Sequence, residues 1–148
     1  MNLDFKKIVY LLCTILVVIF IFYNSMQNGD DSSKASMSVL TFINNIITNI
    51  GLDFQMEGNF IRKLAHFVEF FIFGTFLMLT FVSFTNKTFS ETGFPMFFVT
   101  FVPVVDEYIQ IFSVGRASSV KDVLLDFFAG MTGIILVCIC CKLKRKNK

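Results

Sequence analysis

Nine polar or ionisable residues lie near the ends of three apolar segments, where a membrane protein accommodates them least easily. Ionisable groups at membrane depth cost several kcal/mol each unless they are paired, so they are rare and usually functional. The nine residues are Arg62, His66, Glu69, Asp106, Glu107, Gln110, Arg116, Asp122 and Asp126. Their chemistry depends on whether the segments that contain them bring them together.

These residue types suit acid–base chemistry and the binding of anions. Neighbouring carboxylates cannot all ionise unless arginine, a metal or raised pKa values balance them. A carboxylate held partly protonated beside a histidine suits general acid–base catalysis, in which Glu69 or Asp106 would act with His66. Arg62 and Arg116 suit a phosphate or carboxylate group, because a guanidinium binds both bidentately.

A metal site and a purely structural network are the alternatives. His66 and three carboxylates would offer hard or borderline ligands, but a single histidine without a recognised metal motif argues against a metal. In the structural interpretation Arg62 and Arg116 pair with carboxylates and His66 bonds one of them, which fixes helix register without any chemistry. The sequence assigns no cofactor.

Composition indicates an integral membrane protein with one bundle of helices. The 148 residues are 55% hydrophobic, include 21 phenylalanines and have a mean hydropathy of +0.70. Charged residues make up only 16%, which is below the proportion in soluble domains. Five of the thirteen basic residues occupy positions 142–148. Lysines just past an apolar helix are more typical of a membrane anchor than of a nucleic-acid site, so we expect no nucleic-acid partner.

The apolar segments predict an all-α membrane fold with four transmembrane helices. We place them at about 5–23, 62–84, 94–112 and 120–141, each close to the ~20 residues needed to cross. The first segment resembles a signal peptide, but its length and the lack of a small-residue cleavage site favour an uncleaved helix. Between the first two segments, residues 29–33 predict a loop and residues 36–50 an amphipathic helix at the membrane interface, with Gly51 as its stop.

Charge bias predicts cytoplasmic termini. An even number of spans puts both termini on one side, and Lys6, Lys7 and the basic tail 142–148 indicate that this side is the cytoplasm. With Lys87, eight basic residues lie inside against five outside.

This topology brings the nine residues to the outer end of the bundle. The second span enters from outside, so Arg62, His66 and Glu69 lie in its first two turns, on one face. The third span leaves the cytoplasm and places Asp106, Glu107 and Gln110 in its outer half. The fourth begins with Asp122 and Asp126 and continues in small residues. Close packing is expected between Gly74 and this stripe of Ala129, Gly130 and Gly133.

Several of these motifs resemble the VanZ-like family, in the same order and at similar intervals along nearly the whole chain. The matching segments are Asn24-Ser25-x-Gln27, Arg62–Phe70, Asp106–Gln110, Gly115–Ser118 and Asp122–Asp126. The resemblance implies a small bacterial membrane protein of the cell envelope, and the founding member of the family is linked to low-level teicoplanin resistance. The chain differs from the family pattern at Phe70, where a tyrosine is common, and at Ile109, where a histidine is common. A family proline near Val114 is also missing.

From this we expect a cell-envelope membrane protein, with membrane lipids around it, that binds an anionic lipid or a lipid-linked cell-wall component. Binding alone and chemical modification of this ligand are both compatible with the nine residues. The alternative is a non-enzymatic structural or partner-binding module in which the charged cluster only fixes helix packing. A small transporter is less compatible, because beyond Lys6 and Lys7 at the start of the first span the inner halves of the four spans contain no Asp, Glu, Lys, Arg or His.

Overall fold

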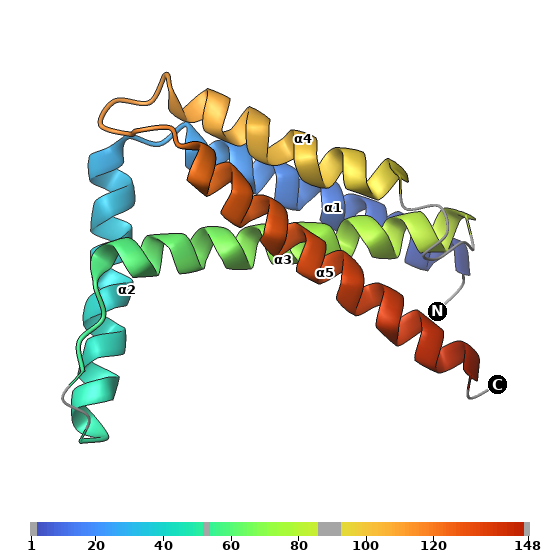
Figure 1. Cartoon of the computed structure of the whole chain (residues 1–148), viewed down its shortest axis with the longest axis horizontal. Helices are drawn as coiled ribbons and strands as arrows, with labels where there is room; N and C mark the ends of the chain where they lie inside the picture. The colour runs from blue at the N-terminus through green and yellow to red at the C-terminus, as the bar shows by residue number, and fades with distance from the viewer. Residues whose placement is uncertain (1–2, 52–53, 86–92, 147–148) are drawn as a thin grey trace.

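The computed structural model describes residues 3–51, 54–85 and 93–146, and this part of the chain folds into helices joined by turns and short connections (Figure 1). The helices are α1 (Leu3–Ser25), α2 (Gly29–Asn49), α3 (Gly58–Thr85), α4 (Gly93–Gln110) and α5 (Val120–Lys146). The all-α class predicted from the sequence is confirmed.

Three of these helices are long and apolar enough to cross a membrane. The stretches Asp4–Ser25, Gly58–Thr85 and Val120–Lys144 have 22, 28 and 25 residues, which exceeds the ~20 residues that a crossing needs. α4 is shorter, with 18 residues, and its C-terminal part contains three polar side chains. Length and composition therefore support a membrane protein, and the crossing by the fourth predicted segment, 94–112, stays a prediction.

α2 begins earlier than the sequence indicated, so the prediction of a loop at 29–33 was wrong. Asn28 has an extended conformation before the first turn (φ −62°, ψ 150°), and the N–H of Gly29 donates to the carbonyl of Val114 at 2.9 Å. This bond fixes the start of the helix against the connection between α4 and α5. Asp30 also lies in the first turn, where a negative charge favours a helix. The predicted stop is confirmed at Gly51, which has a φ of +80°.

The other helix ends lie close to the predicted ones. α3 begins at Gly58 rather than 62, so Arg62 lies in its second turn instead of at its start. α5 continues to Lys146 and includes most of the segment 142–148 that we expected to be a tail.

α3 is the central helix of the fold, because it contacts each of the other four. Its side chains Phe70, Phe73, Leu77 and Met78 are buried in a core that the other long helices complete. Outside this core, α1 and α4 expose large apolar side chains such as Leu16. An exposed apolar surface on long helices is expected for a protein surrounded by lipid tails.

Glycines allow α3 and α5 to approach closely. A Cβ atom added to Gly74 of α3 would overlap the backbone carbonyl of Gly130 in α5. A Cβ added to Gly133 would overlap the carbonyl of Phe71 and the backbone of Thr75. The two helices share the most extensive contact in the fold, as the small-residue stripe predicted.

The two ends of the bundle differ in what they contain (Figure 1). The start of α1 and the end of α5 lie at one end, whereas the connections α1–α2, α2–α3 and α4–α5 lie at the other. α2 stands across the direction of the remaining helices. The second end is therefore the one that can gather the polar side chains.

The close contact of α3 and α5 predicts that Gly74→Ala lowers stability. The added methyl group meets backbone rather than a flexible side chain, and overpacking of this kind costs about 1–3 kcal/mol. The apparent midpoint of thermal unfolding of the detergent-purified protein should therefore fall. Gly93→Ala is the matched control, because no atom of the described residues lies within 4 Å of the added atom. Equal midpoints for the two variants would contradict the close packing.

Candidate functional site

The nine residues singled out from the sequence lie together at the end of the bundle that holds the helix connections. Seven of them line one small cavity of about 10 Å³: Arg62, His66, Glu107, Gln110, Arg116, Asp122 and Asp126. Glu69 lines a neighbouring cavity with Arg62, His66 and Arg116. Asp106 completes the set, because one of its oxygens lies within 4.8 Å of ligand atoms on His66 and Asp126.

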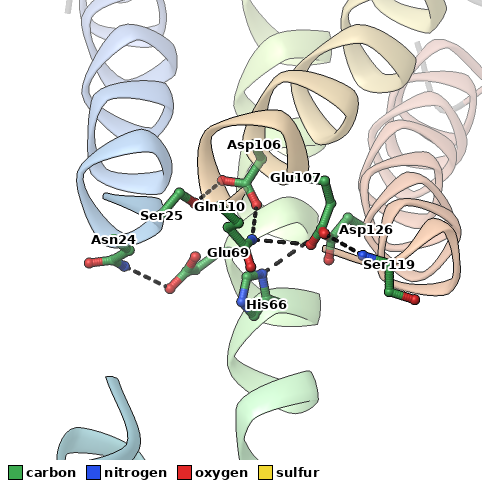
Figure 2. Close-up of polar contacts among 9 residues, drawn as sticks. All are labelled: Asn24, Ser25, His66, Glu69, Asp106, Glu107, Gln110, Ser119 and Asp126. Atoms are coloured by element: carbon green, nitrogen blue, oxygen red, sulfur yellow. Dashed lines mark hydrogen bonds and ion pairs between the residues drawn. The ribbon is translucent and has the colours of Figure 1, made fainter. Parts of the chain in front are cut away.

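Two buried carboxylates of α4 share one amide donor (Figure 2). Nε2 of Gln110 donates to Oδ2 of Asp106 at 2.9 Å and to Oε1 of Glu107 at 3.1 Å. All three side chains are buried, and Asp106 is fully inaccessible. The second carboxylate oxygen of Glu107 accepts a hydrogen bond at 2.8 Å from the backbone N–H of Ser119, the residue before α5. Glu107 therefore joins α4 to the start of α5.

The end of α1 provides donors that the sequence analysis left out of the site. Nδ2 of Asn24 donates to Oε1 of Glu69 at 3.0 Å, and the hydroxyl of Ser25 donates to Oδ1 of Asp106. The hydroxyl of Ser113 in turn donates to the carbonyl of Ser25 at 2.7 Å. The signal for Asn24 and Ser25 was the family-like motif Asn24-Ser25-x-Gln27, whereas nothing in the sequence pointed to Ser119.

Asp126 of α5 differs from the other buried carboxylates because no described donor reaches it. It is fully inaccessible, and neither of its oxygens makes a hydrogen bond within the described part of the chain. Its Oδ2 lies 3.8 Å from Nδ1 of His66, an atom that is itself buried and makes no hydrogen bond with any described residue. The side chains of His66, Asp106 and Asp126 face one another from three helices and could hold a metal.

The two arginines of the site have no carboxylate partner at ion-pair distance within the described part of the chain. Among the described residues, neither Arg62 nor Arg116 lies within 4 Å of a carboxylate oxygen. Burial lowers the pKa of the Arg116 guanidinium from its ordinary value, while the more distant carboxylates raise it and Arg62 lowers it. Arg116 follows Gly115, whose φ of +76° turns the chain back toward the cavity.

A polar cavity and an apolar groove adjoin each other beside these arginines. The polar cavity has a volume of about 140 Å³ and is lined by Asn24, Gln27, Ser32, Ser36, Arg62, Ala65, His66, Glu69 and Arg116. The apolar groove between α2 and α3 has a volume of about 420 Å³ and is lined by Ser36, Val39, Ile43, Ile61, Leu64, Ala65, Val68 and Glu69. Ser36, Ala65 and Glu69 line both, so the two spaces are neighbours.

Comparison with known families agrees with the motifs. The sequence profile of the family described as VanZ/LLP1 matches residues 8–141. The chain belongs to this family. All nine site residues, together with Asn24, Ser25 and Ser119, lie inside the matched range. No curated protein and no solved structure gives a match.

The structure gives a context for two differences from the VanZ-like pattern. Phe70 is fully buried and packs edge-to-face on Phe73, with ring centroids 6.4 Å apart. This apolar position has no need of a tyrosine hydroxyl. Ile109 occupies the other position, so His66 is the single histidine of the chain. Any chemistry of this VanZ/LLP1 protein that uses an imidazole must use His66.

The shared amide donor predicts that Gln110→Met lowers stability. Methionine has a similar length but cannot donate to Asp106 or Glu107, and a buried acceptor left without its partner costs about 1–3 kcal/mol. The apparent midpoint of thermal unfolding in detergent should fall. Tyr108→Phe, which removes an exposed hydroxyl from the same helix, should leave it unchanged. If the two variants unfold at the same temperature, the amide does not stabilise the carboxylates.

Proposed function

We propose that the chain is a four-span membrane protein of the bacterial cell envelope whose termini lie in the cytoplasm. α1, α3, α4 and α5 would cross the membrane, and α2 would lie at the outer interface. The crosswise position of α2 and the position of the start of α1 and the end of α5 at one end of the bundle support this topology. α4, with 18 residues, is about 27 Å long, close to the hydrocarbon thickness of about 30 Å.

The function that this site supports best is recognition of the anionic head group of a lipid or a lipid-linked cell-wall component. Its main support is the junction of the polar cavity with the apolar groove. An amphiphile needs both kinds of surface, and the groove between α2 and α3 would accommodate part of an acyl or prenyl chain. The head group would then lie at the polar cavity, beside Arg62 and Arg116.

The lining of the polar cavity, with two arginines and one carboxylate, favours an anion over a neutral or cationic head group. Both guanidiniums lie at the cavity without an ion-pair partner among the described residues. Their planar donors match the oxygens of a phosphate or carboxylate. Binding an anion there would replace water at two cationic groups that no described carboxylate pairs with.

Modification of the bound head group is the second candidate, favoured by one observation. His66 and Glu69 line the same polar cavity as the arginines, so an acid and a base would face the ligand. Asp106 is less suited to this role, because it is fully buried and already accepts two hydrogen bonds. A role in resistance to glycopeptides of the teicoplanin type is proposed from the family resemblance.

The purely structural alternative is favoured by the bonds of Ser25 and Ser119, which join α1 and the start of α5 to α4, and by those of Gln110 within α4. These bonds explain why part of the cluster exists without any ligand. They leave the arginines without a structural role, which is why we favour ligand binding.

Head-group binding predicts that Arg116→Gln weakens the affinity for anionic lipid. A hydrogen bond to a charged group contributes about 1.5–3 kcal/mol, so the loss should be about tenfold or more. Native mass spectrometry of the purified protein with phosphatidylglycerol and with phosphatidylcholine would measure it. The expected loss is confined to phosphatidylglycerol.

Lys121→Gln is the matched control for this experiment. Lys121 is an exposed basic residue at the same end of the bundle, and it lines neither the polar cavity nor the groove. Equal losses in the two variants would indicate a general charge effect and would contradict a specific site.

If the chain modifies the head group, Glu69→Gln should abolish the modification without lowering the abundance of the protein. Glutamine keeps the oxygen that accepts from Asn24, so abundance should stay unchanged, whereas a proton can no longer be transferred. Lipid and muropeptide profiles, with teicoplanin susceptibility, would be compared among cells with no gene, the wild-type gene and each variant gene.

We expect a product in cells with the wild-type gene and in cells with Glu57→Gln, the control at an exposed acid. The product should be absent without the gene and in cells with Glu69→Gln. Identical profiles with and without the gene would contradict modification and leave binding as the proposed function.

A further inference from the structure

We propose that His66, Asp106 and Asp126 bind a divalent transition-metal cation such as Zn²⁺ or Mn²⁺. The three side chains come from α3, α4 and α5, and each offers one ligand atom within 4.8 Å of the other two (Figure 2). The site uses neither arginine, although its ligand His66 also lines the polar cavity. The inference does not rest on the proposed function.

The main support is the state of Asp126. This carboxylate is fully buried, and no described donor reaches either oxygen. A buried carboxylate without hydrogen bonds or a counter-charge is costly, so such groups are normally paired or bound to a metal. His66 does not meet this need directly, since the 3.8 Å between Nδ1 and Oδ2 is too long for a hydrogen bond.

The same gap is only slightly larger than the separation of two atoms that share a metal. Ligands that lie about 2.0–2.2 Å from Zn²⁺ are separated from each other by about 3.0–3.5 Å. Nδ1 of His66 and Oδ2 of Asp126 are slightly farther apart than this, and Asp106 lies within 4.8 Å of both, so all three side chains would move inward to coordinate one cation. Nδ1 of His66 also has no hydrogen-bond partner among the described residues, and it is therefore available as a ligand.

Asp106 has the surroundings of a metal-binding carboxylate. The hydroxyl of Ser25 and the amide of Gln110 donate to its two oxygens and fix its orientation. Each oxygen keeps a second lone pair that can bind a cation. Outer residues that orient ligands in this way are typical of metal sites.

Local charge favours a divalent cation. Five carboxylates gather here, on Glu69, Asp106, Glu107, Asp122 and Asp126, against three basic side chains, on Arg62, Lys63 and Arg116. One divalent cation would balance this excess of two formal negative charges. An imidazole with carboxylates suits Zn²⁺ or Mn²⁺ better than Ca²⁺ or Mg²⁺, which prefer oxygen ligands alone.

The proposed site would have an open coordination position. Three protein ligands leave at least one position for water, as in catalytic zinc sites. His66 and Asp126 both line the small cavity, whose volume of about 10 Å³ is close to the minimum for one water molecule.

The test is metal loading of the full-length, tag-free protein in detergent, with the four cysteines replaced by alanine so that Cys138, Cys140 and Cys141 cannot bind zinc. After treatment with a chelator, Zn²⁺, Mn²⁺ or Mg²⁺ is added separately, and bound metal and thermal unfolding are measured. We expect one equivalent of Zn²⁺ or Mn²⁺ per chain and a higher unfolding midpoint, with a smaller effect of Mg²⁺.

Asp126→Asn and His66→Gln should abolish both effects. Asp122→Asn should keep them, since it removes a carboxylate from the same cavity but outside the three ligands. Ser25→Ala should weaken metal binding about 10–100-fold through Asp106. Retained binding in Asp126→Asn, or equal loss in Asp122→Asn, would overturn the site.

A measurement on the unsubstituted ligands covers the case in which these variants do not fold. Co²⁺ added to the cysteine-free protein should give visible absorption bands of nitrogen and oxygen coordination. A chain that binds none of these cations would overturn the inference and show that protons or a water molecule satisfy Asp126.

Discussion

The burial of carboxylates at one end of a helical bundle is the constraint on which the rest of this structure depends. Asp106 and Asp126 are fully inaccessible and lie on neighbouring helices. A charge in such surroundings is costly unless donors or counter-charges compensate it. Where the ends of α1 and α4 meet, Ser25 and Gln110 supply donors to Asp106, and Ser119 before α5 supplies one to the adjacent Glu107. No described donor reaches Asp126.

The contact between α3 and α5 determines how closely the remaining groups approach. Gly130 lies one turn beyond Asp126 along α5, and its backbone leaves no space for a side chain at Gly74 of α3. Gly74 is about 12 Å along the helix from His66. Two helices that touch at their backbones bring His66 and Asp126 into proximity, so the packing of small residues and the polar site are parts of one arrangement.

The sequence predicted the parts of this arrangement that follow from periodicity and from the direction of the spans. The spacing of Arg62, His66 and Glu69 puts them on one face of α3, and each reversal of the chain returns the polar ends to the same level. Sequence reasoning missed the start of α2, because the bond between Gly29 and Val114 joins residues that are distant along the chain. It also missed Ser119, which contributes a backbone N–H that any residue except proline would supply.

Neutral hydrogen-bond donors explain why the acids and arginines of the site form no ion pairs with each other among the described residues. Gln110 and the N–H of Ser119 donate hydrogen bonds to Glu107, and Asn24 donates one to Glu69. These carboxylates therefore need no guanidinium partner. An arginine paired with a carboxylate would have its planar donors filled and would bind a ligand oxygen only after breaking that pair. By satisfying the acids with amides and hydroxyls instead, the protein leaves Arg62 and Arg116 available beside the polar cavity. The structural network and a ligand site are therefore compatible, because the first keeps the cationic groups of the second unpaired.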